Sequence, residues 1–242
     1  SNARPNSDSP LYRVKDQIKP YVIKEIDGQR VGIIGILKVE KTKNSSLVSD
    51  DVEFSPEIET AKKYVSELEE QGIDKIVLLS HVGYYNDVLF AQEVPGIDVI
   101  VGGDSHTLLD STGALKDAGL SVDYQGQTGP FAGYSHEGIE EENLGEYPTT
   151  VTGPEGEPVH IVTAWQYAYG VGVLNVEFNE EGIAVKADGN IILPVEGPFL
   201  RKNDEGNRVE VDDATRQDIM QTISDSPVLT YAPQSSEMEE LL

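Results

Sequence analysis

The 242-residue sequence predicts an α/β fold, because apolar runs typical of strands alternate with amphipathic helical patterns along its first half. Residues 75–79 and 97–101 are apolar without polar alternation, as strands buried on both faces are. A helical pattern precedes each run, over residues 55–72 and 86–94. The order strand–helix–strand–helix–strand indicates a layered domain.

The segment before the first helix predicts a hairpin. Residues 1–10 are rich in Ser, Asn, Pro and Asp, which favours disorder. Strands are expected over residues 21–26 and 30–37, joined by a turn at Asp27-Gly28. The glycines of the second strand indicate close approach by a packed layer. Residues 38–51 are polar and are expected to form an irregular loop at the carboxyl end of that strand.

Both helices carry start and stop signals. Ser55 is expected to cap the first, with Pro56 at the first helical position and Gly72 beyond the end. Asn86 is expected to cap the second, which Pro95-Gly96 breaks. The inward residues are Ile58, Ala61, Val65 and Leu68 in the first helix and Val88, Leu89 and Ala91 in the second.

The second half of the chain predicts a long insertion followed by hairpins. Residues 107–148 are glycine-rich and acidic, which is typical of a surface insertion, one that could overhang a site. Alternating patterns then predict strands, and one more helical pattern follows. The strands are expected over residues 149–152, 159–163, 172–178, 183–186 and 190–195, and the helix over 212–223.

Composition excludes some functions. The chain has 18 basic and 43 acidic residues and a net charge of −25, so it would repel a nucleic-acid backbone. This charge is typical of a soluble secreted or salt-adapted protein, and a cation-attracting surface is the alternative. The absence of cysteine excludes disulfides and thiol catalysis. No stretch has the ~18 apolar residues of a membrane span.

Candidate metal ligands follow two of the predicted strands. His81 ends the first apolar run, and Asp104 and His106 follow Gly102-Gly103 after the second. Ligands gather at the carboxyl ends of strands in α/β sheets, and two imidazoles with one carboxylate suit a divalent metal. A structural role is the alternative for His81. Other ligands would have to come from Asp110 or residues 38–51.

The remaining histidines and an aromatic cluster are expected to have structural roles. His136 lies in the insertion and is expected to be a solvated loop residue, and His160 lies on a predicted strand. Trp165 with Tyr167 and Tyr169 could stack on bases, but such a cluster more often belongs to a core or a sheet edge.

The strand-end motifs resemble those of the bacterial 5′-nucleotidase family, which belongs to the calcineurin-like metallophosphoesterases. The resemblance rests on Leu79-Ser80-His81-Val82-Gly83, the Gly96-to-Leu109 segment with Gly102-Gly103-Asp104-Ser105-His106, and residues 162–176, and it covers roughly residues 18–195. It implies a four-layer α/β/β/α sandwich with mixed sheets and a centre of two divalent ions.

The resemblance also implies roles for the three candidates. His81 and His106 fall on metal-binding histidines of the family. Asp104 stands where the family's Gly-His-x-His motif has its first histidine, so the identity of the metal (Mn, Zn, Ca or Mg) stays open. The family's front motifs, Asp-x-His, Gly-Asp and Gly-Asn-His-Glu/Asp with its catalytic histidine, do not occur before the first strand-end motif in this chain.

These departures lead us to expect the second half of a catalytic domain. Ser1-Asn2-Ala3 is typical of a tag remnant, so residues 1–17 would be a disordered lead. Residues 18–200 would be the partial phosphoesterase domain, and residues 201–242 a linker helix and tail towards an absent substrate domain.

The expected function is hydrolysis of a 5′-nucleotide, or another phosphate ester, by metal-activated water in the parent protein, exported to the periplasm or outside the cell. This chain alone is expected to be inactive and to self-associate. The alternatives are an alkaline phosphatase or cyclic phosphodiesterase of the same family, or a degenerate module that binds a cation or a partner without catalysis.

Overall fold

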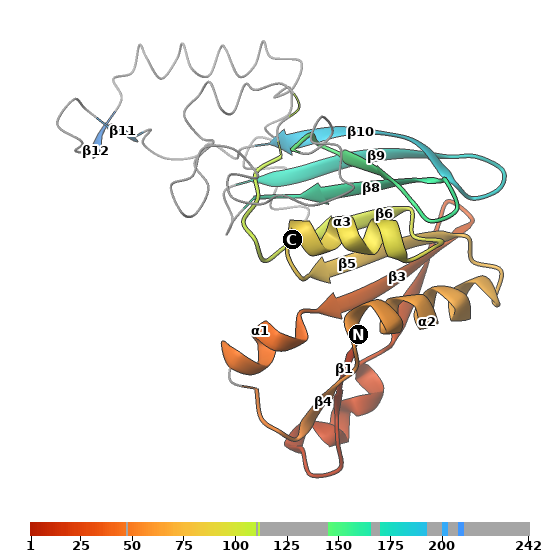
Figure 1. The fold of residues 1–242 in the computed structure, drawn as a ribbon, viewed down its shortest axis with the longest axis vertical. Coiled ribbons are helices and arrows are strands. Elements are labelled where there is room, and N and C mark those ends of the chain that lie inside the picture. The colour runs from red at the N-terminus through yellow and green to blue at the C-terminus, as the bar shows by residue number, and fades with distance from the viewer. Residues whose placement is uncertain are drawn as a thin grey trace.

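A six-stranded sheet forms the centre of the molecule in the computed structural model, which describes residues 1–46, 48–109, 111, 145–165, 170–192, 200–202 and 208–210. Figure 1 shows this sheet with helices packed against it. The strand order is β2 (Tyr21–Ile26), β3 (Gln29–Leu37), β5 (Lys75–His81), β6 (Val99–Gly102), β8 (Pro158–Thr163) and β7 (Thr149–Thr152).

The sheet is mixed, which confirms the predicted α/β fold class. Strands β3, β5, β6 and β8 run parallel, and β2 and β7 pair antiparallel at the two edges. The two antiparallel edge strands belong to hairpins that were predicted from turn residues in the sequence. Asp27 and Gly28 have φ of 50° and 77°, and Ile26 pairs with Gln29, so the β2–β3 turn has two residues as expected.

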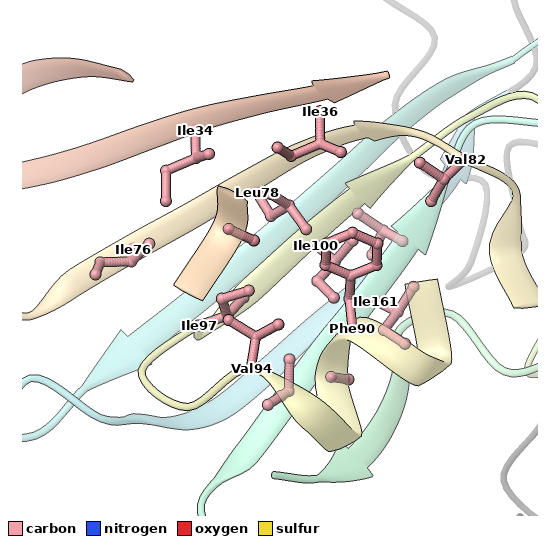
Figure 2. Close-up of a cluster of buried hydrophobic side chains, with 14 of the residues drawn as sticks. Ile34, Ile36, Ile76, Leu78, Val82, Phe90, Val94, Ile97, Ile100 and Ile161 are labelled. Carbon is pink, nitrogen blue, oxygen red and sulfur yellow. The ribbon is translucent and has the colours of Figure 1, made fainter. Parts of the chain in front are cut away.

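Two helices cover one face of the sheet and bury the main core. Helix α2 (Glu57–Glu69) and helix α3 (Tyr84–Glu93) follow β4 and β5 in the chain. Figure 2 shows Phe90 and Val94 of the α3 segment among isoleucines of the sheet. The predicted α2 stripe is confirmed, since Ala61, Val65 and Leu68 are at most 2% exposed.

Two details of the helix predictions are wrong. Pro56, not Ser55, is the cap of α2, and α3 begins at Tyr84 after Gly83. Asn86 lies inside α3 and donates from Nδ2 to the carbonyl of Val82 (2.7 Å). In α3, Val88 and Ala91 are buried as expected, but Phe90 is buried at 2% exposure while Leu89 is only half-buried. Tight strand-to-helix turns set these starts, and sequence signals place them only within a few residues.

The N-terminal segment is ordered, contrary to the expected disordered lead. β1 (Ala3–Pro5) pairs with β4 (Val52–Phe54), and a 3-10 helix (Pro10–Gln17) follows. Asn2 is 2% exposed, donates to the carbonyl of Leu37 and accepts from its N–H, both at 2.9 Å. These two bonds hold Asn2 against the carboxyl end of β3. The supposed loop 38–51 contains a short helix, α1 (Val39–Asn44).

A second hairpin packs against the main sheet. It comprises β9 (Val171–Phe178) and β10 (Ala184–Ile192). The two strands expected over 183–186 and 190–195 are therefore one continuous strand over 184–192, and residues 193–195 lie outside the described residues. As predicted, Leu174, Val176 and Phe178 share the more buried face of β9. A small separate hairpin follows, of β11 (Leu200–Lys202) and β12 (Arg208–Glu210).

Asp98 holds the second hairpin to the main sheet. Its carboxylate is 7% exposed and accepts from the backbone N–H of Ile76 (2.8 Å) and of Ala184 (3.2 Å). Burial raises the pKa of Asp98 to about 7, against the effect of these two bonds.

Some expectations lie outside the described residues. They concern residues 112–144 of the insertion, which include His136, and the helix over 212–223. Within the described part of the chain, no helix combines the length and apolar character that crossing a membrane requires.

Candidate metal centre

The candidate ligands lie at the carboxyl edge of the parallel strands, as predicted. His81 is the last residue of β5 and pairs in register with Leu37 at the end of β3. The chain leaves β3 at Lys38, whose N–H donates to the carbonyl of His81 (3.2 Å). The loop after β6 begins at Gly103. The ends of three neighbouring strands therefore meet at one place.

Hydrogen bonds join the loops after β5 and β6. The N–H of Gly83 donates to the carbonyl of Gly103 (3.0 Å), and the N–H of Tyr84 donates to Oγ of Ser105 (3.0 Å). Gly83 has a φ of 92°, a conformation that glycine adopts without strain. These contacts fix the position of the β6 loop relative to His81.

The β6 loop carries two residues in a left-handed backbone conformation. Asp104 has a φ of 87° and His106 a φ of 55°. Residues other than glycine rarely adopt such angles, and each instance costs about 1–3 kcal/mol, so they are concentrated at functional sites. Both of these conformations fall on residues that the sequence predicted as metal ligands.

His81 and Asp104 come together, and a lysine joins them. Nε2 of His81 lies 3.5 Å from Oδ1 of Asp104. The ammonium of Lys41, on α1, donates to the same oxygen. The side chain of Asp104 is 8% exposed, whereas those of His81 and Lys41 are 62% and 49% exposed. A nearly buried carboxylate thus faces one imidazole and one ammonium.

The distance between His81 and Asp104 fits a divalent ion bound by both residues. Two ligands bound about 2.0–2.2 Å from one ion lie about 3–3.5 Å apart, close to the separation of His81 and Asp104. An imidazole nitrogen with a carboxylate oxygen suits zinc or manganese. However, among the described residues no three His, Asp or Glu side chains are grouped closely enough to hold a metal. The structure therefore brings two of the predicted ligands close together, and metal binding by His81, Asp104 and His106 stays a prediction.

Asp87 is a buried carboxylate next to the strand ends that carry the candidate ligands. It is fully buried on α3, and Oγ of Ser80 donates to its Oδ1. Its Oδ2 has no hydrogen-bond partner in the described structure and lies where a Cβ on Gly102 would be. Burial raises the pKa of Asp87 to about 7, the Ser80 bond opposes the rise and the charge of Asp104 adds to it. Asp87 ties α3 to the strand residue that precedes His81.

Among the remaining candidates, His160 has the structural role that was expected. His160 is 4% exposed, and its ring nitrogens lie 3.0 Å from Oγ1 of Thr150 and from the carbonyl of Ala184. Burial lowers the pKa of His160. Trp165 is half-buried, and Tyr167, Tyr169 and Asp110 lie outside the described residues.

Lys41 and Asp87 were not identified from the sequence. Lys41 lies in the polar segment 38–51, from which further metal ligands were expected. Its side chain is a cation, whereas the sequence search looked for carboxylates that could bind a metal. Asp87 precedes the inward Val88 and lies one helical turn before the inward Ala91. The position of Asp87 on the buried side of the predicted helix could have identified it, because a buried carboxylate needs a partner.

Comparison with known proteins shows similarity to 5′-nucleotidases along most of the chain. The chain is 33% identical to a probable 5′-nucleotidase of Treponema pallidum over 244 residues, which cover 100% of this chain and 37% of that protein. It is 36% identical to the NAD 5′-nucleotidase of Haemophilus influenzae over 224 residues, covering 92% of this chain and 33% of that protein. No family model matches.

Solved structures agree with these relatives. The NAD nucleotidase of Haemophilus influenzae superposes with a TM-score of 0.74 at 35% identity, covering 94% of this chain and 40% of that one. A 5′-nucleotidase precursor from Thermus thermophilus gives a TM-score of 0.62 at 35% identity, covering 79% of this chain and 32% of that one. The chain thus spans about a third of the length of the relatives that it matches, at 37% and 33%. With at least 33% identity over at least 92% of its length to these relatives, and a matching fold over 94% of it, this chain belongs to the 5′-nucleotidase family.

Proposed function

We propose that this chain is the second half of the catalytic domain of a metal-dependent 5′-nucleotidase, which hydrolyses a 5′-phosphate ester. The observation that carries the proposal is the meeting of His81 and Asp104, 3.5 Å apart at the carboxyl edge of the sheet. It occurs in a chain whose relatives are named 5′-nucleotidases.

The substrate is a nucleotide, with two candidates. The names of the relatives point to nucleoside 5′-monophosphates and, for the Haemophilus protein, to NAD. The greater structural similarity, at a TM-score of 0.74, is to the NAD nucleotidase. Assaying the full-length protein with NAD and with AMP side by side, with products separated by chromatography, distinguishes the two.

His81, Asp104 and His106 would hold a metal ion, and the separation of 3.5 Å between Nε2 of His81 and Oδ1 of Asp104 supports this assignment. When bound, a divalent ion supplies Lewis-acid activation of water and stabilises the charge that develops on the phosphoryl oxygens. We propose a site for two ions in the full-length protein, of manganese, zinc, calcium or magnesium. Carboxylate and imidazole ligands are compatible with all four, with a preference for the harder ions at Asp104.

Metal binding by this chain tests the proposal directly. Titration with Mn²⁺, followed by the loss of its free EPR signal, is expected to show binding that His81→Ala weakens at least about tenfold, because one ligand is removed. His136→Ala, at a histidine that the sequence does not assign to the site, serves as the control and should bind like the wild type. Equal Mn²⁺ affinity in the wild type and His81→Ala would contradict the assignment.

The 242-residue chain should have no phosphatase activity of its own. A two-metal phosphoesterase needs several ligands and a group that stabilises the leaving oxygen, and this chain supplies three candidate ligands. We expect no Mn²⁺-dependent release of p-nitrophenol from p-nitrophenyl phosphate. Clear turnover that His81→Ala abolishes would show that the missing ligands are present in this chain.

A second candidate function is a degenerate module that binds a cation or a partner without catalysis. One observation favours it: Asp104 is already paired with the ammonium of Lys41. The coding sequence upstream of residue 1 decides between the two. Asp-x-His and Gly-Asn-His-Glu motifs there would support the enzyme, and their absence would support the module.

We also propose an exported location and self-association. Venom 5′-nucleotidases are among the relatives, for example one from Gloydius brevicauda that is 31% identical over 80% of this chain. Self-association would follow from the apolar side chains that are exposed on one face of the sheet.

A further inference from the structure

Asp104 is neutralised by a cation that belongs to the protein. Its side chain is 8% exposed, and the ammonium of Lys41 donates to Oδ1. A carboxylate this buried requires a cationic or hydrogen-bonding partner, since its desolvation is costly. Lys41 provides that partner from α1, an element outside the sheet and the main core.

The ammonium of Lys41 is bound to the same Asp104 oxygen that a metal ion would use. Oδ1 is also the Asp104 atom that lies 3.5 Å from Nε2 of His81, so an ion shared by these two residues would bind to Oδ1. A lysine nitrogen hydrogen-bonded to a metal-bound oxygen lies about 3–4 Å from the metal, and like charges at about 4 Å repel strongly where water is partly excluded. Lys41 and a divalent ion therefore compete for Asp104.

Lys41 is able to leave. Its side chain is 49% exposed, and α1 has no buried residue among its six. A lysine has a flexible four-carbon stem and is well hydrated, so it can move into solvent without disturbing the fold. The backbone of the β6 loop does not depend on Lys41, because the contacts of Gly103 and Ser105 hold it to the β5 loop.

We propose that Lys41 is a built-in competitor of the metal: its ammonium neutralises Asp104 in the metal-free chain and is displaced when a divalent ion binds between His81 and Asp104. The inference rests on the proposed metal site and goes beyond it, since it assigns a role to a residue that is not a ligand. Lys41 lowers the affinity for metal and keeps the empty site from accumulating uncompensated charge.

The experiment compares Lys41→Met with Lys43→Met in the 242-residue chain. Both variants remove one positive charge from α1, but only Lys41 is paired with Asp104 in the described structure, whereas Lys43 lies over the ring of Phe54, 5.7 Å from its centre. We measure the dissociation constant of Mn²⁺ by EPR and the shift in melting temperature that Mn²⁺ causes, because a ligand that binds only the folded state raises it.

The expected result is that Lys41→Met binds Mn²⁺ at least about fivefold more tightly than Lys43→Met, as the loss of a competing ion pair implies. The shift in melting temperature should be larger for Lys41→Met as well. Equal affinities of the two variants, or weaker binding by Lys41→Met, would overturn the inference, because Lys41 would then be a bystander or would hold Asp104 in place for the metal.

Failure of the metal site itself has a different signature. In that case neither the wild type nor Lys41→Met binds Mn²⁺, or His81→Ala leaves the binding unchanged, and both proposals are wrong. Binding that His81→Ala weakens but Lys41→Met does not strengthen overturns only the role of Lys41.

Discussion

Two buried aspartates show how single residues shape this chain. Asp98 links the sheet to the β9–β10 hairpin through two backbone N–H groups, and Asp87 links α3 to Ser80. Burial raises the pKa of each carboxyl group to about 7. Neither is expected to bind metal, since the first accepts hydrogen bonds that hold two layers together and the second is buried beneath the site.

The pKa of Asp98 makes stability depend on pH. Between its ordinary value of 3.8 and about 7, the folded chain holds a proton on Asp98 that the unfolded chain has released. Stability therefore falls as pH rises through this window, and below it the contribution vanishes because both states are protonated. Asp98→Asn stays neutral, so the decline in the free energy of unfolding with pH should be smaller in this variant.

Urea unfolding at several pH values from 4 to 8 measures this slope. The control is Asp16→Asn, because the side chain of Asp16 is 87% exposed and its replacement should keep the wild-type slope. Asparagine can satisfy only one of the two N–H donors, so the variant should also be less stable by about 1–3 kcal/mol. Parallel pH profiles for Asp98→Asn and the wild type would show that Asp98 is ionised in the folded chain.

At the scale of elements, the contact between β3 and α2 depends on one glycine. A Cβ on Gly32 would lie 2.6 Å from Cδ1 of Leu68, whereas a Cβ on Gly35 would have nothing within 4 Å. The close approach expected from the glycines of this strand is thus confirmed at Gly32 and wrong at Gly35. Leu68 is fully buried, so its side chain has little room to move.

Alanine substitutions at the two glycines separate packing from backbone entropy. Gly32→Ala should lower the free energy of unfolding by about 1–3 kcal/mol through overpacking against Leu68. Gly35→Ala should leave it unchanged or raise it by up to about 1 kcal/mol, because alanine restricts the unfolded chain. Chemical unfolding of both variants measures the difference, and equal effects would mean that α2 shifts to make room.

The sequence predicts elements better than it predicts their ends. Apolar periodicity located α2, α3 and the parallel strands, because burial of a continuous stripe dominates their energetics. It missed α1 and β1, since neither contributes to the main core and both are held by long-range contacts such as those of Asn2. His81 and Asp104 were found because strand ends are visible in sequence, whereas the approach of Lys41, 63 positions from Asp104, is not.

At the scale of the whole molecule, apolar side chains on one face of the sheet are exposed among the residues that the structure describes. The register places Val22, Leu79 and Val101 on the face opposite α2 and α3, and these residues are 43%, 47% and 39% exposed. Ile26 is on the same face and 56% exposed. The β9–β10 hairpin lies at the β8 end of this face, where His160 contacts Ala184. Contiguous apolar surface of this kind promotes association.

Self-association through this face is expected in solution. Sedimentation velocity of the 242-residue chain should show a sedimentation coefficient that rises with concentration, and Leu79→Lys should suppress the rise by placing a charge on the face. Val171→Lys, at an apolar residue of β9 that is 46% exposed, is the matched control. A single monomeric species at all concentrations would contradict the expectation.

The left-handed residues of the β6 loop affect how the site should be tested by mutation. With φ of 87° and 55°, Asp104 and His106 occupy conformations that cost free energy in any residue except glycine. Alanine at these positions removes the side chain but keeps the strain, whereas glycine removes both. A glycine variant that binds metal poorly and yet unfolds at a higher temperature would reveal a trade of stability for function, which an alanine scan would hide.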